Sequence, residues 1–261
     1  MDFDSVLAGM VAVDGGWTAT VPEDWQQGRT AFGGLSAALA LSACRKLVPD
    51  LPVLRSGQIA YIGPAIGELT MRPTVLRRGK SVTFMGCDLM SGGAVALRAL
   101  YAFGDARPST LSAVAEGPPD CPAPDDCAPM WGDSAMRPGF ARHLDQRPAG
   151  KLMPFSGADT GDLLVWVRHR DPVEPSIEAL VAMGDALPPA SFTRMRQLTV
   201  ISTVTWSFDL FDPHPEDGAG WLLMRSTDDG VGDGYAGQDM AMWSESGRPI
   251  LKARQSVAIF G

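Results

Sequence analysis

The sequence places one carboxylate where it is costly to bury. Asp185 lies one turn after Val181, on the edge of the face with which a helix here would pack against a sheet. A buried carboxylate is unfavourable unless it is paired or takes part in a reaction. The alternative is that Asp185 ends the helix near solvent, but an acidic residue near a helix C-terminus opposes the helix dipole. Asp185 is therefore a candidate general base.

A lone amide lies on an apolar strand face close to the end of the chain. Gln255 alternates with Ala253, Val257 and Ile259. A buried amide needs a hydrogen-bond partner, so Gln255 either bonds to the backbone as a structural residue or orients a reactant. A carboxylate that takes a proton from water, with an amide that aims the water, suffices to hydrolyse a reactive ester without a covalent nucleophile.

Two further groups of residues are candidates for binding a substrate. Gly33 and Gly34 open a helical segment, where backbone N–H groups can stabilise an oxyanion and glycine permits close approach. Tight packing of helix on sheet is an equal explanation for these glycines. Arg77, Arg78 and Lys80 lie in a turn before a strand and can contact phosphates, although a solvated turn explains them too.

Other motifs carry little chemistry. The segment 34–38 resembles a nucleophile elbow around Ser36, but it lacks the final glycine and a preceding strand. The three histidines are expected on the surface or at strand ends, and neither they nor the four cysteines show metal-ligand spacing. No metal and no cofactor is expected.

A proline-rich segment divides the chain into two similar halves. Residues 104–138 hold seven of the 21 prolines, which favours an extended connector. The predicted domains are residues 1–104, a linker over 105–137, and residues 138–261. When the Phe-Gly pairs that end each half (103–104 and 260–261) are superposed, Gln255 falls on Arg98. This superposition predicts that the candidate site is kept in one copy only.

Each half has one helical segment followed by alternating strands. The helices are predicted over 32–47, rich in small residues, and over 175–187, bounded by prolines. Alternation of apolar and polar residues predicts strands over 17–21, 69–76, 82–89, 163–169 and 199–211. The fold class is therefore α+β, a tandem (double) hotdog in which each half wraps an antiparallel sheet around one helix.

The chain resembles the acyl-CoA thioesterase II family of double hotdogs. The resemblance rests on Phe32-Gly33-Gly34, the segment 76–81, the segment 184–189 and a Gln in the last strand, in that order over nearly the whole chain. It implies that Asp185, Thr203 and Gln255 jointly hold the attacking water. Thr205, two residues on and expected on the same face as Thr203, is the alternative hydroxyl.

Composition excludes several partners. With 22 basic and 30 acidic residues the net charge is -8, which disfavours nucleic acid and anionic membrane surfaces. No stretch approaches the roughly 20 apolar residues of a membrane span, and the first ten residues lack the positive region of a secretory signal. A cytoplasmic protein that forms homo-oligomers of the double-hotdog unit is expected.

These observations predict hydrolysis of acyl-CoA thioesters, within fatty acid metabolism, to the free acid and CoA. One rival is a hotdog dehydratase or hydratase, which needs a catalytic His near a helix; none is expected beside the core-facing side of either helix. The other rival is a non-catalytic acyl-CoA binding or scaffold hotdog protein, because a fold does not by itself fix a function.

Overall fold

The computed structural model describes residues 1–111, 113, 115–132, 134 and 137–260. Its α-helices are α1 (Phe3–Ala8), α2 (Gly33–Leu47) and α3 (Ile177–Met183). Its strands are β1 (Val11–Val13), β2 (Gly16–Thr20), β3 (Gln26–Gln27), β4 (Thr30–Ala31), β5 (Leu54–Tyr61), β6 (Glu68–Arg78), β7 (Thr83–Ser91), β8 (Ala94–Phe103), β9 (Leu144–Pro148), β10 (Asp162–His169), β11 (Val200–Leu210), β12 (Leu222–Gly232), β13 (Tyr235–Ser244) and β14 (Pro249–Phe260).

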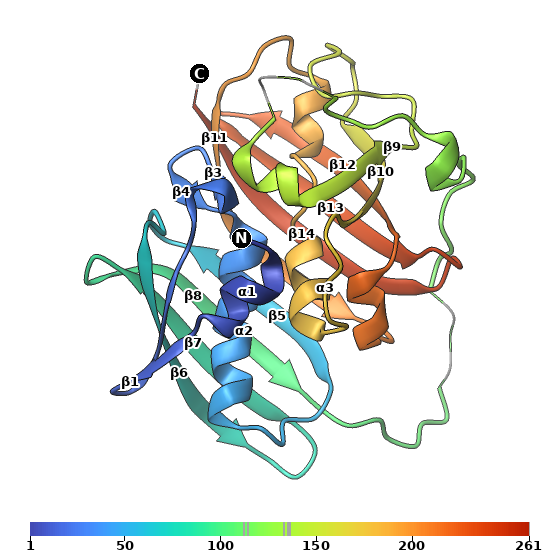
Figure 1. The fold of residues 1–261 in the computed structure, drawn as a ribbon. Coiled ribbons are helices and arrows are strands. Elements are labelled where there is room, and N and C mark those ends of the chain that lie inside the picture. The colour runs from blue at the N-terminus through green and yellow to red at the C-terminus, as the bar shows by residue number, and fades with distance from the viewer. Residues whose placement is uncertain (112, 114, 133, 135–136, 261) are drawn as a thin grey trace.

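The two halves share one antiparallel sheet. Its 12 strands run in the order β1-β2-β6-β7-β8-β5-β11-β14-β13-β12-β10-β9, so the halves join where β5 pairs with β11. The sheet curves around α2 and α3, which lie side by side on the same face (Figure 1). We call this the inner face of the sheet. The predicted tandem hotdog is confirmed.

α2 is buried almost throughout because of its composition. From Gly34 to Cys44 it is apolar or small on every side, with Ser36 and Ser42 as its polar residues, and its first charged residue is Arg45 in the last turn. Such a helix is stable only when it is enclosed. Its alanines, among them Ala37, Ala38 and Ala40, let the sheet close tightly around it. The predicted helix over 32–47 agrees with the structure to within one residue.

α3 is shorter than the predicted helix over 175–187. Ser176 caps its N-terminus by accepting a hydrogen bond from the Ala179 N–H. The helix ends at Gly184, so Asp185 lies in the turn that follows rather than on the helix. A β-carbon on Gly184 would lie 2.9 Å from the Trp206 ring, so glycine is needed there and the turn packs directly on β11.

The superposition of the Phe-Gly endings is wrong in register. Phe103 is buried whereas Phe260 is exposed. Arg98 lies on the outer face and pairs with Asp88 at 2.7 Å, whereas Gln255 lies on the inner face and is 3% exposed. An odd shift along a strand exchanges its faces, so Arg98 is not the counterpart of Gln255.

The connector lies against the C-terminal half. In the described part of 105–137 there is a single 3-10 turn, Pro124–Asp126, and no strand. Backbone carbonyls of Glu116 and Pro122 accept hydrogen bonds from the indole N–H groups of Trp243 and Trp166, each at 2.9 Å. These contacts fix the connector on the outer face of the sheet.

The junction between the halves generates a first prediction. Gly57 of β5 pairs with Phe208 of β11, and a β-carbon on Gly57 would overlap the Phe208 ring. Gly57→Ala should therefore lower the free energy of unfolding by about 1–3 kcal/mol, the usual cost of overpacking. Gly63→Ala is the control, because its β-carbon would meet only ordinary contacts at 3.7 Å and beyond. Denaturant unfolding measures the free energy of unfolding of both variants. An equal decrease in Gly57→Ala and Gly63→Ala would contradict the prediction that the β5–β11 packing limits stability.

Candidate active site

Asp185 is buried where α3 meets the start of α2. Asp185 is 9% exposed. The Gly34 N–H at the α2 N-terminus donates to its carboxylate, and the Oδ2 atom lies 2.5 Å from where a β-carbon on Gly33 would stand. A β-carbon on Gly34 would overlap the Ala182 carbonyl oxygen of α3. The absence of side chains at the paired glycines therefore lets α2 pack closely on α3, rather than on the sheet, and lets the Gly34 N–H reach the carboxylate.

A chain of side-chain amides fixes the opposite side of the carboxylate. Gln255 Nε2 donates to Asp185 Oδ1 at 2.8 Å, and Gln238 Nε2 donates to Gln255 Oε1 at 2.6 Å. Gln238 Oε1 in turn accepts from the Ala190 N–H at 2.8 Å. A backbone N–H can only donate, so this last bond sets the orientation of both amides. Gln255 must therefore present its NH2 group to Asp185.

Burial changes the acidity of this carboxyl group. Loss of hydration raises the pKa of Asp185 to about 7, while the hydrogen bonds from Gln255 and the Gly34 N–H act in the opposite direction. A carboxylate with a pKa near neutrality is a far better base than a solvated one and still ionises at physiological pH. The candidate site thus holds a carboxyl group that can take up or release a proton near neutral pH.

The structure separates the two threonines. Thr203 pairs with Val257, one inner-face position beyond Gln255, and is half-buried. A bulge between Thr203 and Thr205 shifts the register, so Thr205 pairs with Ser256 and is exposed on the outer face. The expectation that both threonines share a face is therefore wrong. Within the described residues, Thr203 makes no direct side-chain hydrogen bond to Asp185 or Gln255.

Arg77, Arg78 and Lys80 lie far from the carboxylate in this chain. Arg78 pairs with Asp50 at 2.5 Å, just beyond the C-terminal end of α2, whereas Asp185 lies at the N-terminal end of that helix. A helix of 15 residues is roughly 22 Å long. The structure therefore does not bring these basic residues to the Asp185 site.

The three histidines do not contact Asp185 or Gln255, although His169 lies at a position that the sequence did not predict. His169 ends β10 and is buried beside the Ala179 backbone of α3, a helix-facing position that was not expected. Burial lowers its pKa to about 4, so it is neutral. Ala179 lies at the other end of α3 from Asp185, roughly 9 Å away along the axis. His143 stacks on Trp25, and His214 is exposed.

Two residues at the site were missed from the sequence. Gln238 shows the same signal as Gln255, a polar residue in an inner-face row with Ala236, Met240 and Met242. Tyr61 carries no such signal, because only the pairing of the halves brings it near Asp185. Its hydroxyl lies 3.0 Å from the position of a β-carbon on Gly33.

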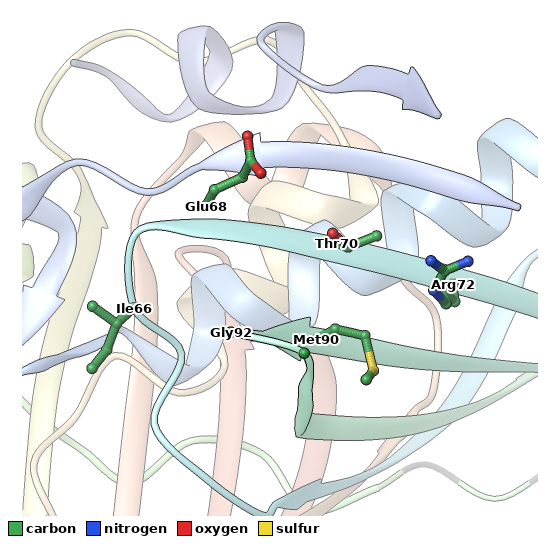
Figure 2. Close-up of a pocket in the computed structure, with 7 residues that line it drawn as sticks. Ile66, Glu68, Thr70, Arg72, Met90 and Gly92 are labelled. Atoms are coloured by element: carbon green, nitrogen blue, oxygen red, sulfur yellow. The ribbon is translucent and has the colours of Figure 1, made fainter. Parts of the chain in front are cut away.

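A surface pocket elsewhere does not share this chemistry. Glu68, Thr70 and Arg72 of β6 line it together with Met90 of β7 (Figure 2). These β6 residues alternate with the buried Leu69 and Met71, so the pocket lies on the outer face of the sheet.

In the described ranges, no three His, Cys, Asp or Glu side chains gather as a metal site requires. No helix of the described chain is both long and apolar enough to cross a bilayer.

The fold and the buried carboxylate–glutamine pair define a double hotdog with a candidate hydrolytic site. Family models give the narrower assignment. The acyl-CoA thioesterase N-terminal domain matches residues 21–104, and the acyl-CoA thioesterase C-terminal domain matches residues 118–259. The chain therefore belongs to the acyl-CoA thioesterase family and is a thioester hydrolase.

Solved structures agree with this fold. A hotdog protein from Alicyclobacillus acidocaldarius has a TM-score of 0.89 and 22% identity, covering 99% of this chain and 98% of that one. A thioesterase II described as putative, from Thermobifida fusca, has a TM-score of 0.85 and 21% identity, covering 99% of this chain and 97% of that one. An acyl-CoA thioesterase II from Mycobacterium marinum has a TM-score of 0.78 and 18% identity, covering 99% of this chain and 98% of that one. A comparison with curated proteins gives no match.

The amide chain generates a second prediction. In Gln238→Glu the Ala190 N–H still has an acceptor, but a carboxylate cannot donate to Gln255 Oε1. The Gln255 amide should then turn its NH2 group towards residue 238 and its oxygen towards Asp185. Acyl-CoA hydrolysis should lose on the order of 10²-fold in kcat, as expected when a positioning group is misplaced.

Gln58→Glu is the matched control for this change. Gln58 lies on the exposed outer face of β5 and belongs to no part of the site. Its substitution should leave kcat within twofold. Equal kcat values for wild type and Gln238→Glu would mean that Gln238 does not set the orientation of Gln255.

Proposed function

We propose that the protein hydrolyses acyl-CoA thioesters to free acid and CoA with a water that Asp185 deprotonates. Gln255 and Thr203 hold that water on the inner face of the sheet. The observation that carries the proposal is the buried Asp185 carboxylate, whose pKa is raised to about 7 and whose Oδ1 accepts from Gln255 at 2.8 Å. A purely structural carboxylate gains nothing from such an environment.

The proposed reaction is a direct attack by water. The water oxygen adds to the thioester carbonyl carbon while Asp185 accepts one water proton. The tetrahedral intermediate then collapses, the C–S bond breaks, and the proton on Asp185 is returned to the thiolate of CoA. Gln255 has a second N–H besides the one donated to Asp185, and this N–H is available to hold the water. The first turn of α2 has no side-chain cap, and its Gly33 is half-buried, which supports oxyanion stabilisation by the Gly33 N–H.

The dehydratase alternative has less support. Its chemistry requires an active-site histidine, and His169 lies at the far end of α3 with its pKa lowered by burial. The scaffold alternative would leave a buried ionisable carboxylate without a use. The matches to thioesterase family models also favour hydrolysis over either alternative.

The main test is Asp185→Asn. The amide is nearly isosteric but cannot accept a proton from water at neutral pH. We expect kcat to fall by roughly 10²–10⁴-fold with KM little changed. In the wild type, kcat/KM should rise as the pH increases through about 7, because the base acts only when ionised. Gln255→Ala should cost less, because Gln255 takes no proton. Steady-state thiol release would overturn the assignment if the Asn variant turned over near the wild-type rate.

The two threonines allow a paired test of the third position. Thr203→Val removes a hydroxyl from the inner face, whereas Thr205→Val removes one from the exposed outer face. We expect kcat to fall about 10-fold for Thr203→Val, equivalent to roughly 1.4 kcal/mol of transition-state stabilisation. Thr205→Val should behave as wild type. If the thiol-release assay instead showed a lower kcat for Thr205→Val and a wild-type kcat for Thr203→Val, Thr205 would be the hydroxyl that holds the water.

A further inference from the structure

Tyr61 carries a buried hydroxyl that has no use in the fold. It is the last residue of β5 and, like Ile59, points to the inner face. Its Oη atom is out of contact with water and has no hydrogen-bond partner among the residues that the structure describes. Leaving such a group unpaired is unfavourable, so native proteins rarely do it without a functional reason.

The neighbours of this hydroxyl are the groups of the candidate site. A single point, the position of a β-carbon on Gly33, lies 2.5 Å from Asp185 Oδ2 and 3.0 Å from Tyr61 Oη. The same point adjoins the start of α2, where Phe32 supplies no side-chain cap. Tyr61 therefore brings a donor from the N-terminal half to a carboxylate from the C-terminal half.

A second buried tyrosine hydroxyl is paired, although Tyr61 is not alone among the described residues: Trp206 Nε1 and Ser226 Oγ are also buried without a partner. Tyr101 of the N-terminal half is fully buried, whereas Tyr61 is partly buried, and the Tyr101 hydroxyl donates to the Ala37 carbonyl at 2.7 Å. The Tyr101 hydroxyl thus has a partner in the fold, whereas the Tyr61 hydroxyl, beside Asp185, has none among the described residues. A packing role for the ring explains neither the position of the Tyr61 hydroxyl nor this difference.

The protonation state determines what the hydroxyl can do. Burial, and secondarily the charge of Asp185, hold the pKa of Tyr61 well above its usual value, so the phenol keeps its proton. Asp185 already accepts hydrogen bonds from Gln255 and from the Gly34 N–H. A protonated phenol in this place suits an acceptor that the substrate brings, and a thioester has one such atom, its carbonyl oxygen.

We propose that Tyr61 is a catalytic hydrogen-bond donor that binds the carbonyl oxygen of the thioester beside the first turn of α2. This inference rests on the proposed hydrolysis at Asp185. Tyr61 keeps its proton throughout: it donates to the carbonyl oxygen, the bond strengthens as water adds and the oxygen becomes negative, and it weakens again when the C–S bond breaks. Asp185 alone carries the proton from the water to the thiolate.

Tyr61→Phe tests this role by kinetics and by stability together. With an acyl-CoA that the wild type hydrolyses, kcat should fall about 10²-fold, as for the loss of one oxyanion donor, with KM changed little. The melting temperature should stay the same or rise, because the variant removes an unpaired buried hydroxyl. Tyr101→Phe should do the opposite, with a lower melting temperature and an unchanged kcat, because it removes the bond to Ala37.

The pH profile separates a donor to the substrate from a donor to the base. If Tyr61 acts on the carbonyl oxygen, the acidic limb of kcat/KM keeps its midpoint in Tyr61→Phe and only the plateau falls. A limb moved to higher pH would overturn the proposal, because it would show that Tyr61 stabilises ionised Asp185. A wild-type kcat in Tyr61→Phe would also overturn it. If Asp185→Asn kept its turnover, the proposed hydrolysis itself would fail, which is a distinct result.

Discussion

The burial of the Asp185 carboxylate is the constraint on which the rest of the site depends. A charge held away from water needs donors, and three elements supply or orient them: the first turn of α2 through the Gly34 N–H, β14 through Gln255, and β13 through Gln238. The donors come from both halves of the molecule. The hydrogen bonds to the carboxylate therefore form only when α2, the turn after α3 and the C-terminal strands are all in place.

The continuous sheet provides that alignment. Pairing of β5 with β11 makes the two halves one rigid surface, so α2 and α3 are held against each other on the inner face. The helices meet at Gly34, where any side chain would strike the Ala182 carbonyl, and Gly184 lets the next turn reach Trp206. Two glycines therefore determine how closely the base approaches the N-terminus of α2.

Local pattern predicted what depends on a single element. Alternation placed Gln255 on the inner face, and small residues bounded by a proline gave α2 almost to the residue. Features that depend on pairing between strands could not be read in this way. A bulge moves Thr205 to the outer face, and an odd register difference separates Arg98 from Gln255. Tyr61 reaches Asp185 only because β5 meets β11 across the junction, about which a segment taken alone contains no information.

The two helix N-termini differ in how their backbone N–H groups are satisfied. α3 is capped by Ser176, whose side chain accepts from the Ala179 N–H. α2 begins at Gly33 after Phe32, which offers no cap, and its Gly34 N–H donates to Asp185. Ser176 thus satisfies one N–H of α3 from within its own half, whereas the Gly34 N–H of α2 is satisfied by Asp185 of the other half. The duplicated scaffold is thus symmetric in its strands and asymmetric where hydrogen bonds at the helix ends are left open.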